Sequence, residues 1–443
     1  MFFEQLLRLP GTEICYFYGR LAVPAFAGMT TLLRNHKRYC HPRESGDRFL
    51  KPVTSNMTTD YLRDELIATF GTSNEEIKFF FSPGRVNLIG EHTDYNGGYV
   101  FPCALSFGTY LAVRKTSDPV IRMATTNFNY RAGISLDKLN EKHGDEWVNY
   151  PLGVFSELAK KGFKAQGLEM LYSGNIPNKS GLSSSASIEL VTAVALDTIY
   201  KLGYDRVELV KIGRAAENHF VGVNCGIMDQ FAVGMGKKDH AIYLNCDTLD
   251  YELVPMNIAG YKLVIANTNK SRGLADSKYN ERVAECQAAV QALQPGKKIQ
   301  YLAELTGAEF AQYQHLITDQ TVMRRARHAV LENERTSLAV KTLKEGDLFT
   351  FGQLMNDSHD SLRYDYEVTG IELDTLVEET RKIPGVIGSR MTGAGFGGCT
   401  VSLVKDEAVE NLIRTVGPAY QAITGLTADF YVAEIGDGAK QIK

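Results

Sequence analysis

The sequence has few cysteines for its length and no pair of them at a metal-binding spacing. Seven cysteines are scattered over 443 residues, and none belongs to a Cys-x-x-Cys motif. Their number is odd, which does not suit a closed set of disulfides. The pattern argues against a zinc site and fits reduced thiols in a cytosolic protein.

Long apolar runs and an excess of one charge are also missing. No apolar stretch approaches the roughly 20 residues that a membrane-spanning helix needs. The formal net charge is −4, with 23% of residues charged and 44% hydrophobic. These values predict a globular protein that binds neither nucleic acid nor a membrane. The length favours two domains of roughly 150–200 residues each over a single small core.

Residues 1–56 differ from the rest of the sequence. They are richer in basic than in acidic residues and show no sustained hydrophobic period. Their apolar stretch, 21–29, is short and is interrupted by Pro24 and Gly28. We interpret this segment as a disordered leader, or as sequence upstream of a true start at Met57. A secretory segment and a binding arm are the alternatives.

Hydrophobic periodicity predicts helices and strands in alternation over the remaining chain. The expected helices cover residues 61–70, 182–200, 209–220, 276–293, 324–345 and 371–383. The expected strands cover residues 77–81, 99–104, 109–114, 168–173, 241–244, 261–266, 386–391 and 400–403. This order predicts an α/β or α+β architecture.

A dense polar motif follows the expected strand at 77–81. It runs from Phe81 to Tyr99 and contains one proline and four glycines, together with Arg85, Glu91, His92, Thr93 and Asp94. Buried charge is costly unless it is paired or used, so the motif predicts a loop that meets a polar ligand such as a sugar. The alternative is an exposed turn with a local ion pair between Arg85 and Glu91.

A second motif joins a loop to the start of the helix expected at 182–200. Unpaired backbone amides and the positive end of the helix dipole make such a junction a phosphate site. It is not a Walker A loop, because the sequence GxxxxGK[ST] does not occur here. The alternative is a serine N-cap before a closely packed helix. The candidate residues are Lys179, Ser180, Gly181, Leu182, Ser183, Ser184 and Ser185.

Three further segments do not indicate a function when each is considered alone. Residues 393–398 form a glycine-rich turn between two expected strands, which is common in hairpins. Asp229 follows a turn and would by itself be interpreted as a helix cap. Tyr279 would by itself be interpreted as a tyrosine on a helix surface.

Together these motifs resemble those of galactokinases in the GHMP kinase superfamily, in order, from about residue 60 onwards. The quoted segments are Arg85–Tyr99, Pro177–Ser187, Cys225–Phe231, Asn267–Arg282 and Arg390–Cys399. The family usually has glycine at the position of Lys179. The resemblance implies a two-domain α+β GHMP kinase fold with mixed sheets and helices and the active site in the interdomain cleft. The domains implied are 57–236 and 237–443, after the leader 1–56.

The resemblance also implies an activity and a role for each candidate residue. The activity is ATP-dependent, direct in-line phosphorylation of α-D-galactose to α-D-galactose 1-phosphate, the entry to the Leloir route, by a cytoplasmic protein. Asp229 would be the general base, and Arg85 would stabilise the transition state. The sugar would be bound by Glu91, His92, Thr93, Asp94, Gly226 and Tyr279. Residues 179–185 would bind the nucleotide, and Ser185 and Glu217 would hold Mg²⁺.

Two other functions fit the same motifs. An N-acetylgalactosamine or galacturonate kinase would share the Glu91–Asp94 set. A non-catalytic galactose sensor would bind sugar and nucleotide and then a regulator, but Asp229, Arg85 and Glu217 are all present. The expected partners are galactose and ATP, and a monomer is expected rather than an oligomer.

Overall fold

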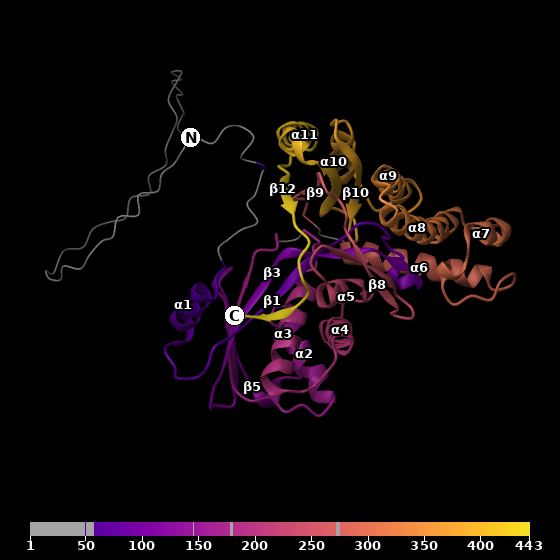
Figure 1. Cartoon of the computed structure of the whole chain (residues 1–443). Helices are drawn as coiled ribbons and strands as arrows, with labels where there is room; N and C mark the ends of the chain where they lie inside the picture. The colour runs from indigo at the N-terminus through magenta and orange to yellow at the C-terminus, as the bar shows by residue number, and fades with distance from the viewer. Residues whose placement is uncertain (1–48, 50–56, 145, 178–179, 272–274) are drawn as a thin grey trace, which may run out of the picture. The chain divides into compact units, whose positions relative to one another are not determined.

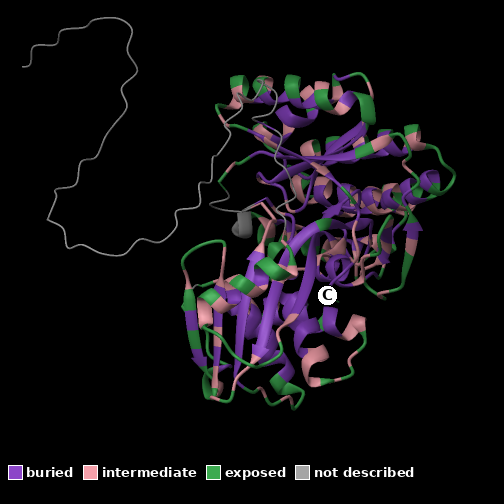
Figure 2. Cartoon of the chain, turned by 60° about the vertical axis from the view of Figure 1, so that its left-hand side comes forward, coloured by how far each residue is buried: buried purple, intermediate pink, exposed green. Residues whose placement is uncertain are grey.

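The computed structural model of the chain describes residues 49, 57–144, 146–177, 180–271 and 275–443. The described residues belong to one compact unit. Within the described residues the strands form three sheets, of six, four and three strands (Figure 1). The strands are largely buried, and exposed residues gather on loops and on the outer faces of helices (Figure 2).

The six-stranded sheet has the order β13-β1-β3-β6-β4-β5. Neighbouring strands run antiparallel, except that β4 and β6 are parallel. The strands are β1 (Lys78–Asn87), β3 (Pro102–Lys115), β4 (Val120–Thr125), β5 (Arg131–Ser135), β6 (Leu168–Gly174) and β13 (Lys440–Ile442). The strand near the end of the sequence therefore pairs with the strand that carries Arg85.

Alternate residues of this sheet face different cores, as the two-residue period of a strand requires. Phe80 and Leu111 pack in a cluster with α2 (Asn149–Lys160) and α3 (Ser184–Tyr200). Phe79 and Ala112 pack in a separate cluster with α1 (Thr59–Phe70). The first cluster also takes in α4 (Arg206–Ala215) and α5 (Met228–Met235). Helices thus cover both faces of the sheet.

The four-stranded sheet has the order β10-β11-β9-β12. Its strands are β9 (Tyr261–Asn267), β10 (Val386–Thr392), β11 (Cys399–Lys405) and β12 (Asp429–Ala433). Val264 and Ala266 pack in a cluster with α10 (Ile371–Arg381) and α11 (Val409–Thr424). Leu263 and Ile265 pack in a cluster with α8 (Gln320–Lys344) and α9 (Leu348–Tyr364).

Three smaller pieces complete the described fold. The three-stranded sheet joins β2 (Tyr99–Val100), β7 (His240–Asn245) and β8 (Tyr251–Pro255). The remaining α-helices are α6 (Ala275–Leu293) and α7 (Gly307–Tyr313). Phe49 is buried against α11, and its carbonyl accepts a hydrogen bond from the Phe430 amide. None of the described helices is both long and apolar enough to cross a bilayer.

The structure confirms the expected helices and corrects several boundaries. The strands expected at 99–104 and 109–114 are instead the short β2 and one continuous β3, because Gly108 lets β3 pass close to Ser82 of β1. The helix expected at 209–220 is α4 followed by a π-helical turn, Ala216–Val221. The polar motif begins inside β1, so that Arg85 lies on a strand and not in a loop. The pattern did not reveal α2, α5, α7, α9, α11, β4, β5, β8, β12 or β13.

Candidate functional site

One cavity of about 570 Å³ brings the sequence motifs together. It is lined by residues from both halves of the sequence. The predicted residues among them are Arg85, Glu91, His92, Asp94, Gly181, Ser183, Ser184, Ser185, Glu217, Gly226, Asp229, Tyr279, Gly393 and Ala394. Three other predicted residues that the structure describes, Thr93, Ser180 and Leu182, do not line it. Lys179 lies outside the described residues.

Arg85 and Asp229 form an ion pair at the wall of the cavity. Arg85 donates from Nε to Asp229 Oδ1 at 2.9 Å, and its Nη2 lies 2.8 Å from the same oxygen. The arginine side chain is 5% exposed and the aspartate side chain is 30% exposed. An arginine that binds a carboxylate through two N–H groups fixes its orientation as well as its charge. The pair therefore presents a fixed carboxylate to whatever enters the cavity.

A break in strand register aims Arg85 at this site. The pairing of β1 with β3 shifts between Pro83 and Arg85. A β-bulge of this kind re-aims a side chain. Gly84 is needed there, because a Cβ on it would lie 2.8 Å from the Leu182 carbonyl oxygen. Arg85 also donates from Nη1 to the Gly181 carbonyl at 2.6 Å, so it ties β1 to the phosphate-loop motif.

Ser183 connects the second motif, residues 179–185, to Asp229. Its Oγ donates to Asp229 Oδ2 at 2.7 Å. Its backbone is left-handed, with φ of 60°, which a non-glycine residue adopts at a cost. Helix α3 begins at Ser184, so the unpaired amides of its first turn lie beside the cavity wall formed by Ser184 and Ser185. Ser180 and Leu182 are buried within the loop.

Glu217 lies on the π-helical turn after α4. π-helical turns are rare and occur often at functional sites. The side chain is buried and accepts a hydrogen bond from Gln230 Nε2 at 2.6 Å. Burial, together with the nearby Asp229 carboxylate, raises the pKa of Glu217 to about 7, although hydrogen bonds with Ser185 and Gln230 oppose this shift. Gly153 of α2 allows the turn to pack closely, since a Cβ there would lie 2.9 Å from Ala216 Cβ.

Asp94 of the polar motif, Phe81–Tyr99, meets Gly226 at the wall of the cavity. A Cβ on Gly226 would lie 1.8 Å from Asp94 Oδ2, so this position has no room for a side chain. Burial of the Asp94 carboxyl, with the Asp229 carboxylate nearby, raises its pKa to about 7. Near neutral pH this carboxyl group is partly ionised, and its ionised form can accept hydrogen bonds from ligand hydroxyls.

Glu91 and Thr93 make hydrogen bonds that fix the loop of the polar motif, Phe81–Tyr99, and only Glu91 of the two also lines the cavity. Glu91 Oε1 accepts from the Gly393 amide at 2.8 Å and lies 3.3 Å from Arg390 Nη1. The hydroxyl of Thr93 lies 2.8 Å from the Gly90 carbonyl and 2.7 Å from the Tyr99 carbonyl, both in the same loop. Glu91 still lines the cavity, whereas Thr93 is buried behind it.

Helix α8 fixes this loop from behind, which no local pattern in the sequence revealed. Glu332 Oε1 accepts from the Gly90 amide at 3.0 Å, and Asn333 Oδ1 accepts from the Tyr99 amide at 2.8 Å. His328 Nε2 lies 3.1 Å from the Glu91 carbonyl. Glu332 is fully buried and pairs with Arg335. Burial alone would raise the pKa of Glu332, but Arg335, His328 and Arg390 lower it to about 2.

Replacement of Glu332 by glutamine is expected to lower the free energy of unfolding by about 3 kcal/mol, because it leaves the charge of Arg335 uncompensated in a buried network. Chemical denaturation measures the change. Glu345→Gln, at the exposed end of the same helix, is the matched control and should change stability by less than about 0.5 kcal/mol. Equal stability of the two variants would contradict a stabilising role for the buried Glu332 carboxylate.

A second cavity of about 190 Å³ adjoins the first and was missed at the sequence level. It shares Tyr150, Ser184 and Ser185 with the larger cavity. Aromatic side chains line it, among them Phe128 and Trp147, whose ring centroids lie 6.5 Å apart. The sequence signal was weak, since these residues stand outside any motif. Aromatic walls beside a helix N-terminus suit a flat base joined to a phosphate chain.

Comparison with known proteins assigns the family. The sequence matches the galactokinase galactose-binding signature over residues 65–115, the GHMP kinases N terminal domain over 149–237 and the GHMP kinases C terminal domain over 339–421. A galactokinase of Fusobacterium nucleatum is 56% identical over 83% of this chain and 96% of its own length. A galactokinase of Bacillus subtilis is 54% identical over 86% of this chain and 100% of its own length.

Solved structures agree with this assignment. Lactococcus lactis galactokinase complexed with galactose superposes with a TM-score of 0.85 at 47% identity, over 86% of this chain and 99% of that one. A mevalonate kinase superposes with a TM-score of 0.59 at 20% identity, over 81% of this chain and 99% of that one, which supports the shared fold alone. The chain therefore belongs to the galactokinase family of GHMP kinases.

Proposed function

We propose that this protein transfers the γ-phosphoryl group of ATP to the anomeric hydroxyl of α-D-galactose, forming α-D-galactose 1-phosphate. The observation that carries the proposal is the Arg85–Asp229 pair, which lies in one cavity with the first turn of α3 and with Asp94 and Tyr279. Phosphoryl transfer needs an aligned nucleophile and neutralised charge more than it needs covalent chemistry. We further propose a monomeric, cytoplasmic enzyme with domains 57–236 and 237–443.

Each residue takes one part of a direct in-line transfer. Asp229 accepts the proton of the anomeric hydroxyl, and Ser183 and Arg85 hold its carboxylate in place. The charge of Arg85 and the amides at the start of α3 stabilise the negative charge on the phosphoryl oxygens. Glu91, His92, Asp94, Gly226 and Tyr279 hold the sugar, and Thr93 shapes the loop that carries them. Gly181 and Ser183–Ser185 line the phosphate path.

Glu217 and Ser185 fit a bound Mg²⁺. Both offer hard oxygen donors on the same cavity wall, and they already lie within hydrogen-bonding distance of each other. The described residues contain no cluster of three or more His, Cys, Asp or Glu side chains arranged to hold a metal. These two oxygen donors would suit Mg²⁺, which usually retains several waters when a protein holds it. When bound, Mg²⁺ supplies charge neutralisation for the triphosphate.

The aromatic second cavity is the proposed site of the adenine base. Trp147 is the single tryptophan of the sequence, so tryptophan emission, excited at a wavelength that tyrosine does not absorb, reports on this cavity. Titration with ADP should change the tryptophan emission, whereas titration with galactose should change it little. Trp147→Phe should retain an aromatic wall but lose the signal. An emission that responds to galactose and not to ADP would contradict the placement.

A kinase assay with purified protein tests the function itself. Galactose, N-acetylgalactosamine, galacturonate and arabinose are compared by kcat/KM at fixed ATP. Galactose should be the best substrate. A higher kcat/KM for N-acetylgalactosamine or galacturonate would replace the proposed substrate. Binding of sugar and nucleotide without turnover would instead support a galactose sensor.

Galactose affinity is expected to fall as the pH falls below about 7. Because the pKa of Asp94 is raised to about 7, the free carboxyl is increasingly protonated below that pH. The sugar hydroxyls donate to the ionised form of Asp94. The affinity for galactose is therefore at its maximum above the pKa and falls by about tenfold per pH unit well below it. Calorimetry without nucleotide measures the effect. The experiment uses Glu217→Gln protein, since the pKa of Glu217 is also about 7. A flat profile would exclude Asp94 as an ionised acceptor.

A further inference from the structure

His92 presents an imidazole whose hydrogen-bonding role toward a ligand is not set by its nearest surroundings. Its backbone is left-handed, with φ of 62°. The ring lines the large cavity beside the Ala394 backbone, and its buried Nε2 makes no hydrogen bond of ordinary geometry among the described residues. Burial, with a contribution from His328, lowers the pKa of His92 to about 3, so the ring carries a single proton at neutral pH. Whether Nε2 donates or accepts depends on which nitrogen holds that proton.

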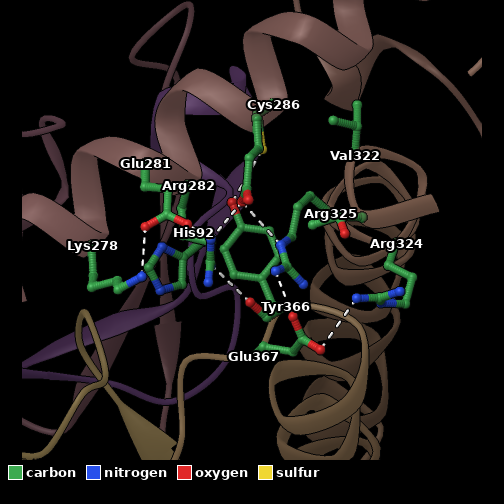
Figure 3. Close-up of polar contacts among 12 residues, drawn as sticks. His92, Lys278, Glu281, Arg282, Cys286, Val322, Arg324, Arg325, Tyr366 and Glu367 are labelled. Carbon is green, nitrogen blue, oxygen red and sulfur yellow. Dashed lines mark hydrogen bonds and ion pairs between the residues drawn. The ribbon is translucent and has the colours of Figure 1, made fainter. Parts of the chain in front are cut away.

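A chain of polar atoms runs from the other ring nitrogen into the protein. His92 Nδ1 lies 2.9 Å from the Tyr95 hydroxyl oxygen, which lies 2.6 Å from the Tyr366 hydroxyl oxygen. The Tyr366 oxygen in turn lies 3.1 Å from Cys286 Sγ. The rings of His92 and Tyr366 also pack together, with centroids 4.8 Å apart. Figure 3 shows His92 beside the Tyr366 ring and Cys286 at the phenol oxygen.

The direction of this chain follows from the strengths of its two ends. Each hydroxyl has one proton, so when both tyrosine protons are used within the chain the three contacts all run toward His92 or all run toward Cys286. A neutral imidazole nitrogen is a strong acceptor, whereas a thiol sulfur is a weak one. Cys286 Sγ also faces the Asn96 amide nitrogen at 3.6 Å, a donor that already uses the sulfur as acceptor. The chain therefore runs from Cys286 to Nδ1, which places the ring proton on Nε2.

Tyr366 is held rigidly in its place beside His92. It is fully buried between α6 and α8. Arg282 of α6 donates from Nε to the Tyr366 carbonyl at 2.9 Å. Arg325 of α8 donates from Nη1 to the Asp365 carbonyl at 2.7 Å and also pairs with Glu367 at 2.6 Å (Figure 3). The backbone on each side of the tyrosine is thus anchored by a buried arginine.

We propose that Tyr366 is a positioning residue for sugar recognition, whose hydroxyl acts through Tyr95 to keep the ring proton of His92 on Nε2, facing the cavity as a donor to a sugar oxygen. The chemical class of ligand is a polyol with an acceptor oxygen at that place. The inference rests on the proposed function for the identity of the sugar. The tautomer of His92 in the free protein does not depend on the proposed function.

Tyr366→Phe removes the hydroxyl and keeps the ring, and Tyr364→Phe is the matched control. Tyr364 is 63% exposed at the end of α9, two residues away. In protein labelled with ¹⁵N-histidine, two-bond coupling spectra should show His92 protonated on Nε2. Tyr366→Phe should give a mixture of tautomers or a shift to Nδ1, and Tyr364→Phe should leave the spectrum unchanged.

Steady-state kinetics gives the second readout. Loss of one hydrogen bond that is equal in the ground and transition states should raise KM for galactose about tenfold, with kcat and KM for ATP within about twofold. Tyr95→Phe breaks the same chain, so the double variant should be no worse than either single one. The single variant Tyr95→Phe also provides the test if Tyr366→Phe does not fold. An unchanged His92 tautomer in both folded variants would overturn the proposal. If wild-type protein fails to phosphorylate galactose but the tautomer responds, the proposed function fails and the positioning role stands.

Discussion

Replacing Asp229 with asparagine is expected to lower kcat by about 10²- to 10⁴-fold while galactose still binds. The asparagine oxygen can still accept from Arg85, so the ion-pair geometry is largely preserved, but the side chain can no longer take a proton. The loss should fall on kcat and kcat/KM together, because the missing interaction forms in the transition state. Initial rates at saturating galactose and ATP measure it.

Two observations separate loss of the base from general damage. Calorimetry should show galactose binding to Asp229→Asn protein within about threefold of the wild-type affinity. Asp247→Asn changes an exposed aspartate in the turn between β7 and β8 and should keep full activity. Turnover by Asp229→Asn protein at a near-normal rate would eliminate this residue as the base.

Gly226→Ala is expected to lower kcat/KM for galactose by about 100-fold. The added methyl group would stand 1.8 Å from Asp94 Oδ2, so either the aspartate or the turn before α5 must move by more than an ångström. Displacements of this size at a substrate-orienting group cost about two orders of magnitude. The loss should appear mainly as a higher KM for galactose, since Asp94 is proposed to bind the sugar and not to act as the base.

The matched control for this substitution is Gly133→Ala. Gly133 lies on β5, and its nearest neighbour to a new methyl group is Val120 Cγ1 at 3.7 Å, an ordinary contact. This variant should retain wild-type kinetics and a thermal midpoint within a few degrees of the wild type. A crystal structure of Gly226→Ala protein with both Asp94 and the turn before α5 in their original places would contradict the steric explanation, whatever the kinetics.

The elements that the sequence predicts well are those fixed by local pattern. Helix α3 follows from a small-residue start and a regular apolar face, and the hairpin of β10 and β11 follows from the glycines between two short apolar runs. The convergence of Arg85, Asp229 and Tyr279 on one cavity was expected from the family resemblance and is found. The individual roles of these residues stay predictions.

The details that the sequence did not reveal depend on contacts between distant residues. Glu91 meets the Gly393 amide about 300 positions later in the chain, and nothing in its own motif indicates that partner. The same holds for Glu332 and Asn333 behind the sugar loop. The bulge that aims Arg85 and the left-handed Ser183 are also set by packing, because local propensity favours neither.

The return of β13 to pair with β1 makes the two halves of the sequence mutually dependent. If the chain were cut at the proposed boundary after residue 236, the first half would lose β13 and bare the edge of β1 along Phe79–Phe81. An open, apolar strand edge is a template for self-association. The first half would also lose the hydrogen bonds from α8 to the Gly90 and Tyr99 amides. Separately produced halves are therefore expected to be insoluble, and co-expression should be needed to recover a working enzyme from two fragments.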